Sequence, residues 1–98
     1  MPAITCQAVG CACARKSSQF MCTPHWKALP LPLRRQVNAT WGAYRAATGD
    51  ARSEAWIDYI AARDEAQRWT AEGEGRLGQF TADAPRLRAL AGLRKGRS

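Results

Sequence analysis

The chain has 98 residues and a net charge of +7. Apolar residues make up 46% of it, but many of them are alanine, so we expect one domain with a modest core. No stretch approaches the roughly 20 consecutive apolar residues of a membrane span, which argues against a membrane partner. The sequence AVGC (8–11) resembles a lipoprotein cleavage box. However, no basic residue and no continuous apolar run precede it, so we reject a signal peptide and expect a cytoplasmic protein.

Charge is unevenly distributed along the chain. Residues 1–49 carry six basic residues and no acid, residues 50–85 carry all eight acids, and residues 86–98 carry five basic residues. A basic N-terminal half suits a polyanionic partner, either a nucleic acid or an acidic protein. The alternative is an arginine-rich solvated surface without a specific ligand. The candidate polyanion-binding residues are Arg15, Lys16, Lys27, Arg34, Arg35 and Arg45.

All four cysteines and the only histidine fall within residues 6–25. Cys22 and His25 form a C-x2-H pair. Cys6 and Cys11 form a C-x4-C pair, with a glycine before the second cysteine that can adopt a positive φ. Two close pairs of nitrogen and sulfur ligands, separated by ten residues, are typical of a tetrahedral zinc site. We therefore predict a structural Zn²⁺ held by Cys6, Cys11, Cys22 and His25.

Cys13 is a fifth candidate ligand. A C-x-C pair crowds a single metal, so we treat Cys13 as the alternate to Cys11, in a C-x6-C pair with Cys6, and otherwise as a free thiol. A disulfide is the weaker alternative, because clustered cysteines in the cytoplasm are more often metal ligands. An iron–sulfur cluster would use four cysteines at tighter spacing. Residues 1–30 are thus predicted to form a zinc-binding region, with space for a short hairpin.

The same residues argue against catalysis. A catalytic zinc keeps one coordination position open and has a general base nearby, whereas here four protein ligands would close the site and no acid precedes residue 50. The only histidine is better used as a metal ligand than as the partner of a nucleophilic cysteine. No glycine-rich phosphate loop is present. We predict that the chain is not an enzyme and that its partner is not a small-molecule substrate.

Residues 31–94 are predicted to be helical and to pack on the zinc region as one domain, with residues 95–98 as a basic tail. The first long helix should cover about 32–47, because its apolar residues recur on one face. Gly49 should end it. The apolar residues of this face are Leu33, Val37, Trp41 and Tyr44.

The second long helix should cover about 54–72, with Ser53 as its N-cap. Asp64 and Arg68 have the spacing of an i,i+4 ion pair within it. After a glycine-rich loop, a short third helix should cover 84–94, with Asp83 as its cap. The predicted fold is therefore mainly α: a zinc-stapled N-terminal loop, two long helices and a short C-terminal helix.

The tryptophans should have different roles. We expect Trp26, together with Leu29, to cover the apolar side of the metal site. Trp41 and Trp56 should pack between the two long helices. Trp69 follows Arg68 late in its helix and is the best candidate for an exposed ring that stacks on a nucleotide base.

The run GC…FMCTPHWKALPLPLRRQVNATWGAY resembles a group of small uncharacterised zinc-binding proteins of bacteria, phages and prophages. Their pattern is a Cys pair followed by M-C-x-x-H-W-x-x-L-P-x-x-L-R-x-x-I/V-x-x-T-W/Y, and it covers about residues 6–45 here. The resemblance implies a zinc-stapled helical module of a mobile element, without an established common activity. Cys13 and the long C-terminal segment depart from the pattern.

From this resemblance we expect an accessory protein that binds a host or defence-related protein in the bacterial cytoplasm. The alternative is a nucleic-acid-binding protein that uses the basic N-terminal half. A weaker similarity exists to the zinc-binding front half of some HNH nucleases. The catalytic His and Asn of those enzymes are missing here, so that activity is not carried over.

Overall fold

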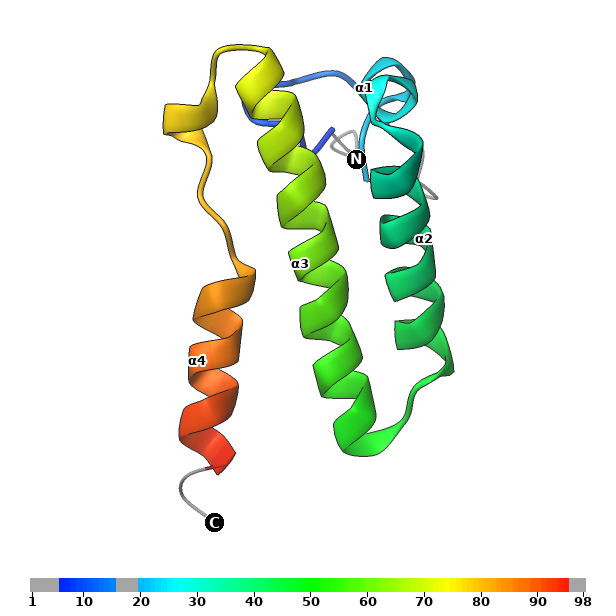
Figure 1. The fold of residues 1–98 in the computed structure, drawn as a ribbon, viewed down its shortest axis with the longest axis vertical. Coiled ribbons are helices and arrows are strands. Elements are labelled where there is room, and N and C mark those ends of the chain that lie inside the picture. Colours follow the sequence, from blue (N-terminus) through cyan, green and yellow to red (C-terminus); the bar gives the residue numbers. More distant parts are fainter. Residues whose placement is uncertain (1–5, 16–19, 96–98) are drawn as a thin grey trace.

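The computed structural model describes residues 6–15 and 20–95, and it is built from helices (Figure 1). The described part of the chain contains no strand, which confirms the mainly α fold, and the predicted hairpin is reduced to a single bridge at Ala14. The elements are α1 (Thr23–Ala28), α2 (Leu31–Ala46), α3 (Gly49–Gly73), the 3-10 turn η1 (Leu77–Gln79) and α4 (Ala84–Lys95).

The two long helices α2 and α3 form an antiparallel hairpin, and α4 runs along the other flank of α3 (Figure 1). The short helix α1 and the N-terminal segment close one end of the hairpin. None of the helices in the described ranges is long and apolar enough to cross a membrane. The predicted tail lies mostly outside the described residues, since Lys95 is still the last residue of α4.

Helix α1 was not predicted. It begins directly after Cys22, with Pro24 in its first turn, and the backbone N–H of Trp26 donates to the carbonyl of Cys22 at 2.9 Å. Proline is compatible with the first helical turn because its missing N–H would have no partner there. The C-x2-H pair is therefore the first turn of a helix rather than an isolated turn.

The boundary between α2 and α3 also differs from the prediction. Gly49 does adopt a positive φ of 60°, but it is the first residue of α3 and not the stop signal of α2, which ends at Ala46. Ser53 therefore lies inside α3 and is not its N-cap. The glycine allows a tight reversal between the helices, and Asp50 then occupies the first turn of α3, where a carboxylate is stabilised by the helix dipole.

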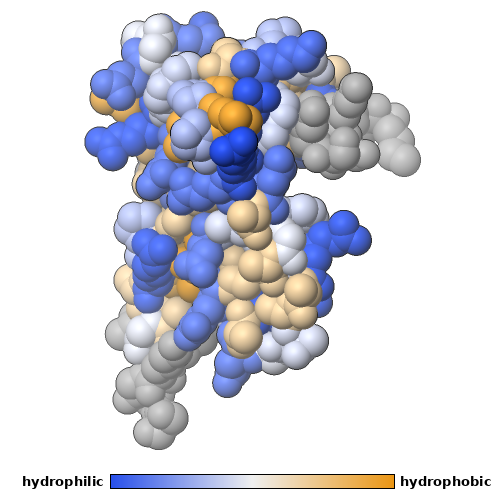
Figure 2. Space-filling model, turned by 45° about the vertical axis from the view of Figure 1, so that its right-hand side comes forward, coloured by the Kyte–Doolittle hydropathy of each residue, from blue (hydrophilic) through white to orange (hydrophobic). Residues whose placement is uncertain are grey.

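The main hydrophobic cluster surrounds the cysteines at one end of the hairpin. Met21 and Leu29 are its most deeply buried large side chains, and Trp26 packs against it, so the expected cover of the cysteine region by Trp26 and Leu29 is confirmed. Helix α3 contributes only small side chains, Ala62 and Ala66. On the side of the molecule that Figure 2 brings forward, moderately apolar side chains gather in the lower half, and the upper half is mostly hydrophilic with a few strongly apolar side chains.

The prediction that Trp41 and Trp56 are core residues is wrong in part. Their rings are 41% and 37% exposed, although each contacts a tyrosine of the opposite long helix. The buried cluster between the helices is formed by Val37 with the small Ala62 and Ala66, whereas the two indoles pack on tyrosine rings and are not part of it. Trp69 is 41% exposed, as expected for a candidate stacking ring.

Helix α4 is capped from α3 and not by its own sequence neighbour. The carboxylate of Asp64, which is 7% exposed, accepts the backbone N–H groups of Asp83 (3.1 Å) and Ala84 (2.8 Å). The side chain of Asp83, the predicted cap, instead forms an exposed ion pair with Arg86 at 3.6 Å. The predicted pair of Asp64 with Arg68 does not form among the described residues, because Asp64 is turned toward α4.

Candidate metal centre

Two backbone turns bring the cysteines and the histidine together. In the N-terminal segment, the N–H of Cys6 donates to the carbonyl of Cys13 at 2.8 Å, and the N–H of Cys11 donates to Ala8 at 3.1 Å. This second turn contains Gly10, whose φ of 74° favours glycine. The N–H of Gln7 donates to Phe20 at 2.9 Å, which fixes the N-terminal segment beside the start of α1.

The ligand atoms of the four predicted residues all lie within 4.8 Å of one another. His25 Nδ1 is 3.1 Å from Cys22 Sγ and 3.5 Å from Cys6 Sγ. A tetrahedral zinc with Zn–S of about 2.3 Å and Zn–N of about 2.0 Å separates its nitrogen and sulfur ligands by roughly 3.5 Å. The cluster of Cys6, Cys11, Cys22 and His25 is therefore positioned to bind a metal ion.

Burial and backbone hydrogen bonds set the acidity of the thiols. Burial raises the pKa of Cys6 to about 11, although the backbone N–H groups of Cys22 and Ala8 oppose this effect. A hydrogen bond from the backbone N–H of Cys13 lowers the pKa of Cys11 to about 7. Because the thiolate is the form that binds a metal, this bond prepares Cys11 for ligation.

Cys13 itself stays outside the cluster. It is exposed, whereas Cys6 and Cys22 are buried, and all four cysteines are free thiols. A hydrogen bond with Cys11 raises the pKa of the Cys13 thiol. The structure therefore pairs Cys6 with Cys11, as in the C-x4-C pair, and not with Cys13. Cys13 contributes backbone hydrogen bonds, to the Cys11 thiol and to the N–H of Cys6.

Glu74, at the end of α3, is a partner of the cluster that the sequence analysis missed. Its Oε2 lies 3.0 Å from Nε2 of His25, and this hydrogen bond raises the pKa of His25 to about 9. In the neutral imidazole, a proton held on Nε2 by Glu74 leaves the lone pair on Nδ1, which faces the sulfurs. Histidines that ligate metals usually donate their second N–H to such a partner. No sequence signal links the two residues, because 49 positions separate them.

Two further side chains, Gln67 near the end of α3 and Arg76 just after it, hold the cysteine turns. Gln67 donates to the carbonyl of Gln7 at 2.7 Å, and Arg76 donates to the carbonyl of Val9 at 3.1 Å. The Arg76 guanidinium packs so closely on Gly10 that a Cβ there would collide with it. The φ of Gly10 therefore favours glycine, and a larger residue would also displace the end of the Arg76 side chain.

We expect the change Glu74→Gln to weaken metal binding about 10- to 100-fold, which is the usual cost of losing an outer hydrogen-bond partner of a ligating histidine. The amide keeps the size of the side chain but removes the charge that holds the Nε2 proton. Competition of the purified variant with a chromophoric zinc chelator measures the affinity. Glu72→Gln, an exposed acid two residues earlier in α3, is the matched control, and equal affinities of the two variants would contradict the role of Glu74.

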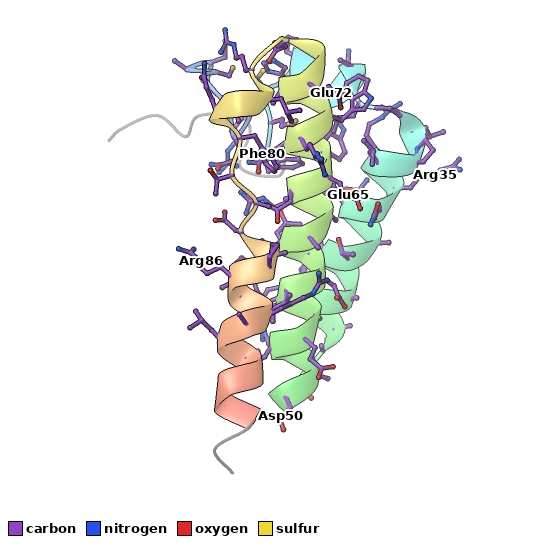
Figure 3. All side chains as sticks on the ribbon, turned by 60° about the vertical axis from the view of Figure 1, so that its left-hand side comes forward. Arg35, Asp50, Glu65, Glu72, Phe80 and Arg86 are labelled. Carbon is purple, nitrogen blue, oxygen red and sulfur yellow. The ribbon has the colours of Figure 1, made fainter. Side chains whose placement is uncertain are left out.

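The predicted polyanion-binding residues do not gather in one place. Arg15 and Arg45 line a common groove, to which α3 adds Arg63. Lys27, Arg34 and Arg35 do not line this groove, and Arg35 points away from α3 (Figure 3). Lys16 lies outside the described residues.

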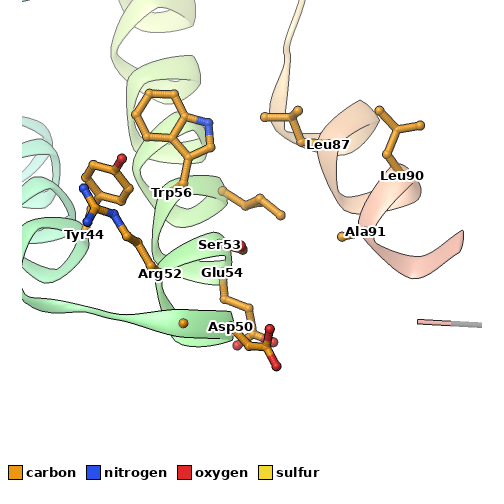
Figure 4. Close-up of a pocket in the computed structure, with 11 residues that line it drawn as sticks. Tyr44, Asp50, Arg52, Ser53, Glu54, Trp56, Leu87, Leu90 and Ala91 are labelled. Atoms are coloured by element: carbon orange, nitrogen blue, oxygen red, sulfur yellow. The ribbon is translucent and has the colours of Figure 1, made fainter. Parts of the chain in front are cut away.

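A second groove lies between the N-terminal part of α3 and α4 and encloses about 790 Å³. Trp56 of α3 lines it from one side and Leu87 of α4 from the other (Figure 4). Asp50 and Glu54 also line it, so its charged residues have both signs, whereas those of the first groove are all arginines.

Comparisons of this chain with protein-family models, with curated proteins and with solved structures found no match. Its function therefore has to be argued from the geometry described above.

Proposed function

We propose that the chain is a non-enzymatic accessory protein in which a structural zinc holds a helical binding surface in place. One observation carries this proposal: three sulfurs and one imidazole nitrogen converge within 4.8 Å, and two of these sulfurs, those of Cys6 and Cys22, belong to the main hydrophobic cluster. Three thiolates and one imidazole are a preferred ligand set of structural Zn²⁺, and together they complete its tetrahedral coordination. A metal so enclosed stabilises the fold rather than activating a substrate.

The proposed partner is a host or defence-related protein in the bacterial cytoplasm. The resemblance of residues 6–45 to small proteins of phages and prophages supports this partner class. The alternative, a nucleic acid, has the support of one specific observation, the shared groove of Arg15, Arg45 and Arg63 beside exposed tryptophan rings.

The metal proposal is tested by elemental analysis of protein purified without added metal. We expect one zinc per chain, and a chain that is folded without any bound metal would overturn the proposal. The partner classes are separated by affinity capture from a bacterial lysate, with and without nuclease treatment. A partner protein retained after nuclease treatment supports the first class, and a complex lost on nuclease treatment supports the second.

A further inference from the structure

The groove lined by Arg15, Arg45 and Arg63 combines positive charge with accessible aromatic rings. We call it the aromatic groove. It encloses about 780 Å³ between the N-terminal segment, α2 and the middle of α3. Its lining includes three arginines and three large aromatic residues: Arg15, Arg45, Arg63, Trp41, Trp56 and Tyr59.

The aromatic residues form a connected set whose outer faces reach solvent. Tyr44 bridges the two tryptophans at centroid distances of 5.5 and 5.1 Å. Tyr59 bridges them too, with its ring centroid 5.0 Å from that of Trp41 and 5.6 Å from that of Trp56. The planes are tilted by 50° and 45°, so the rings contact one another without closing into a stack. Trp41 and Trp56 stay 41% and 37% exposed. Large indole faces held rigidly at a surface are suited to stacking on a flat ligand.

The charged residues that line the aromatic groove all have one sign, although Trp56 also lines the second groove, which contains Asp50 and Glu54. Three arginines line the aromatic groove, and no acidic residue does. The guanidinium of Arg63 lies 5.5 Å from the ring centroid of Phe20 and 5.6 Å from that of Tyr59, so aromatic contacts hold it in place while it keeps its positive charge. A cleft lined by one sign of charge concentrates ligands of the opposite sign.

We propose that the aromatic groove binds single-stranded nucleic acid, with bases stacked on Trp41 and Trp56 and phosphates placed on the arginines. This inference rests on the proposed metal-stapled binding module, because the segment that carries the cysteines also supplies Arg15, and it develops the alternative partner class of that module, a nucleic acid. A duplex hides its base faces, whereas a single strand offers them. An acidic peptide would neutralise the arginines but leave the flat indole faces without a matching surface.

The test uses the full zinc-loaded chain and a fluorescein-labelled oligothymidylate of about twelve nucleotides, a length within the usual site sizes. Fluorescence anisotropy should show binding that weakens with salt. With three arginines on phosphates, log K should fall with log salt at a slope of roughly −2, because each contact on a single strand contributes about −0.7. Trp41→Ala should weaken binding about 5- to 150-fold, the range for loss of one stacked base.

Two matched controls separate the aromatic groove from general effects. Trp69→Ala removes a ring of equal exposure outside the groove and should leave binding unchanged. Arg45→Gln should reduce the salt slope by about 0.7, whereas Arg35→Gln removes the same charge from the same helix outside the groove and should not. If circular dichroism and zinc content show that Trp41→Ala does not fold, the comparison of Arg45→Gln with Arg35→Gln decides alone.

The inference is overturned if zinc-loaded protein does not bind the oligonucleotide at low salt, or if the members of each matched pair behave alike. Displacement of the oligonucleotide by polyglutamate at equal charge concentration would also overturn it and would identify an acidic protein surface as the ligand. Failure of the metal proposal is recognised separately, because elemental analysis would then find no zinc in the folded chain.

Discussion

Removal of the metal is expected to unfold the N-terminal region, at least residues 1–30, and to loosen the end of the α2–α3 hairpin that packs on it. Cys6 and Cys22 belong to the main hydrophobic cluster, and helix α3 contributes only alanines to that cluster. Alanine buries little area, so the apolar contribution of α3 to this cluster is small. Structural zinc contributes roughly 10–16 kcal/mol of apparent binding free energy. This equals or exceeds the whole unfolding free energy of a typical domain, about 5–15 kcal/mol.

The measurement is far-UV circular dichroism and tryptophan fluorescence in excess EDTA, with metal removal confirmed by elemental analysis. Trp26 reports on the cysteine region because it packs against the main hydrophobic cluster. Both signals should change together when the metal leaves. Signals that persist after the metal has been removed would show that the apolar contacts suffice.

Single cysteine variants test which of the cysteines bind the metal. Cys22→Ser removes a buried ligand and should abolish zinc retention, and Cys11→Ser should do the same from its less buried position. Cys13→Ser changes an exposed thiol outside the cluster and should retain the metal. If Cys13→Ser lost the metal while Cys11→Ser kept it, the C-x6-C register would be correct instead.

The four residues of the candidate metal site could be predicted because their signals are local. Each pair is encoded within a few residues, by its spacing and by Gly10. The outer partners could not be predicted, since Glu74 and Arg76 reach the cluster only through the tertiary approach of α3 to the N-terminal segment. An exposed acid and an arginine in a glycine-rich stretch carry no sequence signal for such a role.

Helical periodicity was sufficient to predict the long helices, but not how deeply the residues on each apolar face are buried. It places Val37 and Trp41 on one face of α2, yet Val37 is 4% exposed and Trp41 is 41% exposed. The difference arises from the residues of the opposite helix: Val37 lies in the buried cluster with the small Ala62 and Ala66, whereas Trp41 packs on the ring of Tyr59 and is not part of that cluster. Periodicity within one helix contains no information about the size of the residues that face it.

The helix ends were predicted least well, because a helix end depends on which group satisfies its free N–H or C=O groups. Local sequence rules look for a neighbouring side chain, as with Ser53 and Asp83. In α4 the acceptor comes from Asp64, which is 19 residues before Asp83 in the chain. Such a cap joins α3 to α4 and also satisfies the first N–H groups of α4.

We therefore expect Asp64→Ala to lower the free energy of unfolding by about 2–4 kcal/mol, or to detach α4 at a similar cost. Hydrogen bonds to a charged group contribute about 1.5–3 kcal/mol, and loss of a helix cap costs about 0.5–2 kcal/mol. The variant would leave the N–H of Ala84, a residue only 2% exposed, without its acceptor. Urea denaturation measures the loss, and hydrogen exchange of the α4 amides locates it.

Asp58→Ala is the matched control, because Asp58 also joins α3 to α4, through an exposed ion pair with Arg88 at 3.9 Å. Exposed pairs contribute about 0–1 kcal/mol, so this variant should be nearly neutral. Asp64→Asn keeps one carbonyl acceptor and should lie between the two. If Asp64→Ala were as mild as Asp58→Ala, the buried carboxylate would not be what holds α4 on the hairpin. The packing of the α4 side chains on α3 would then have to account for the position of α4.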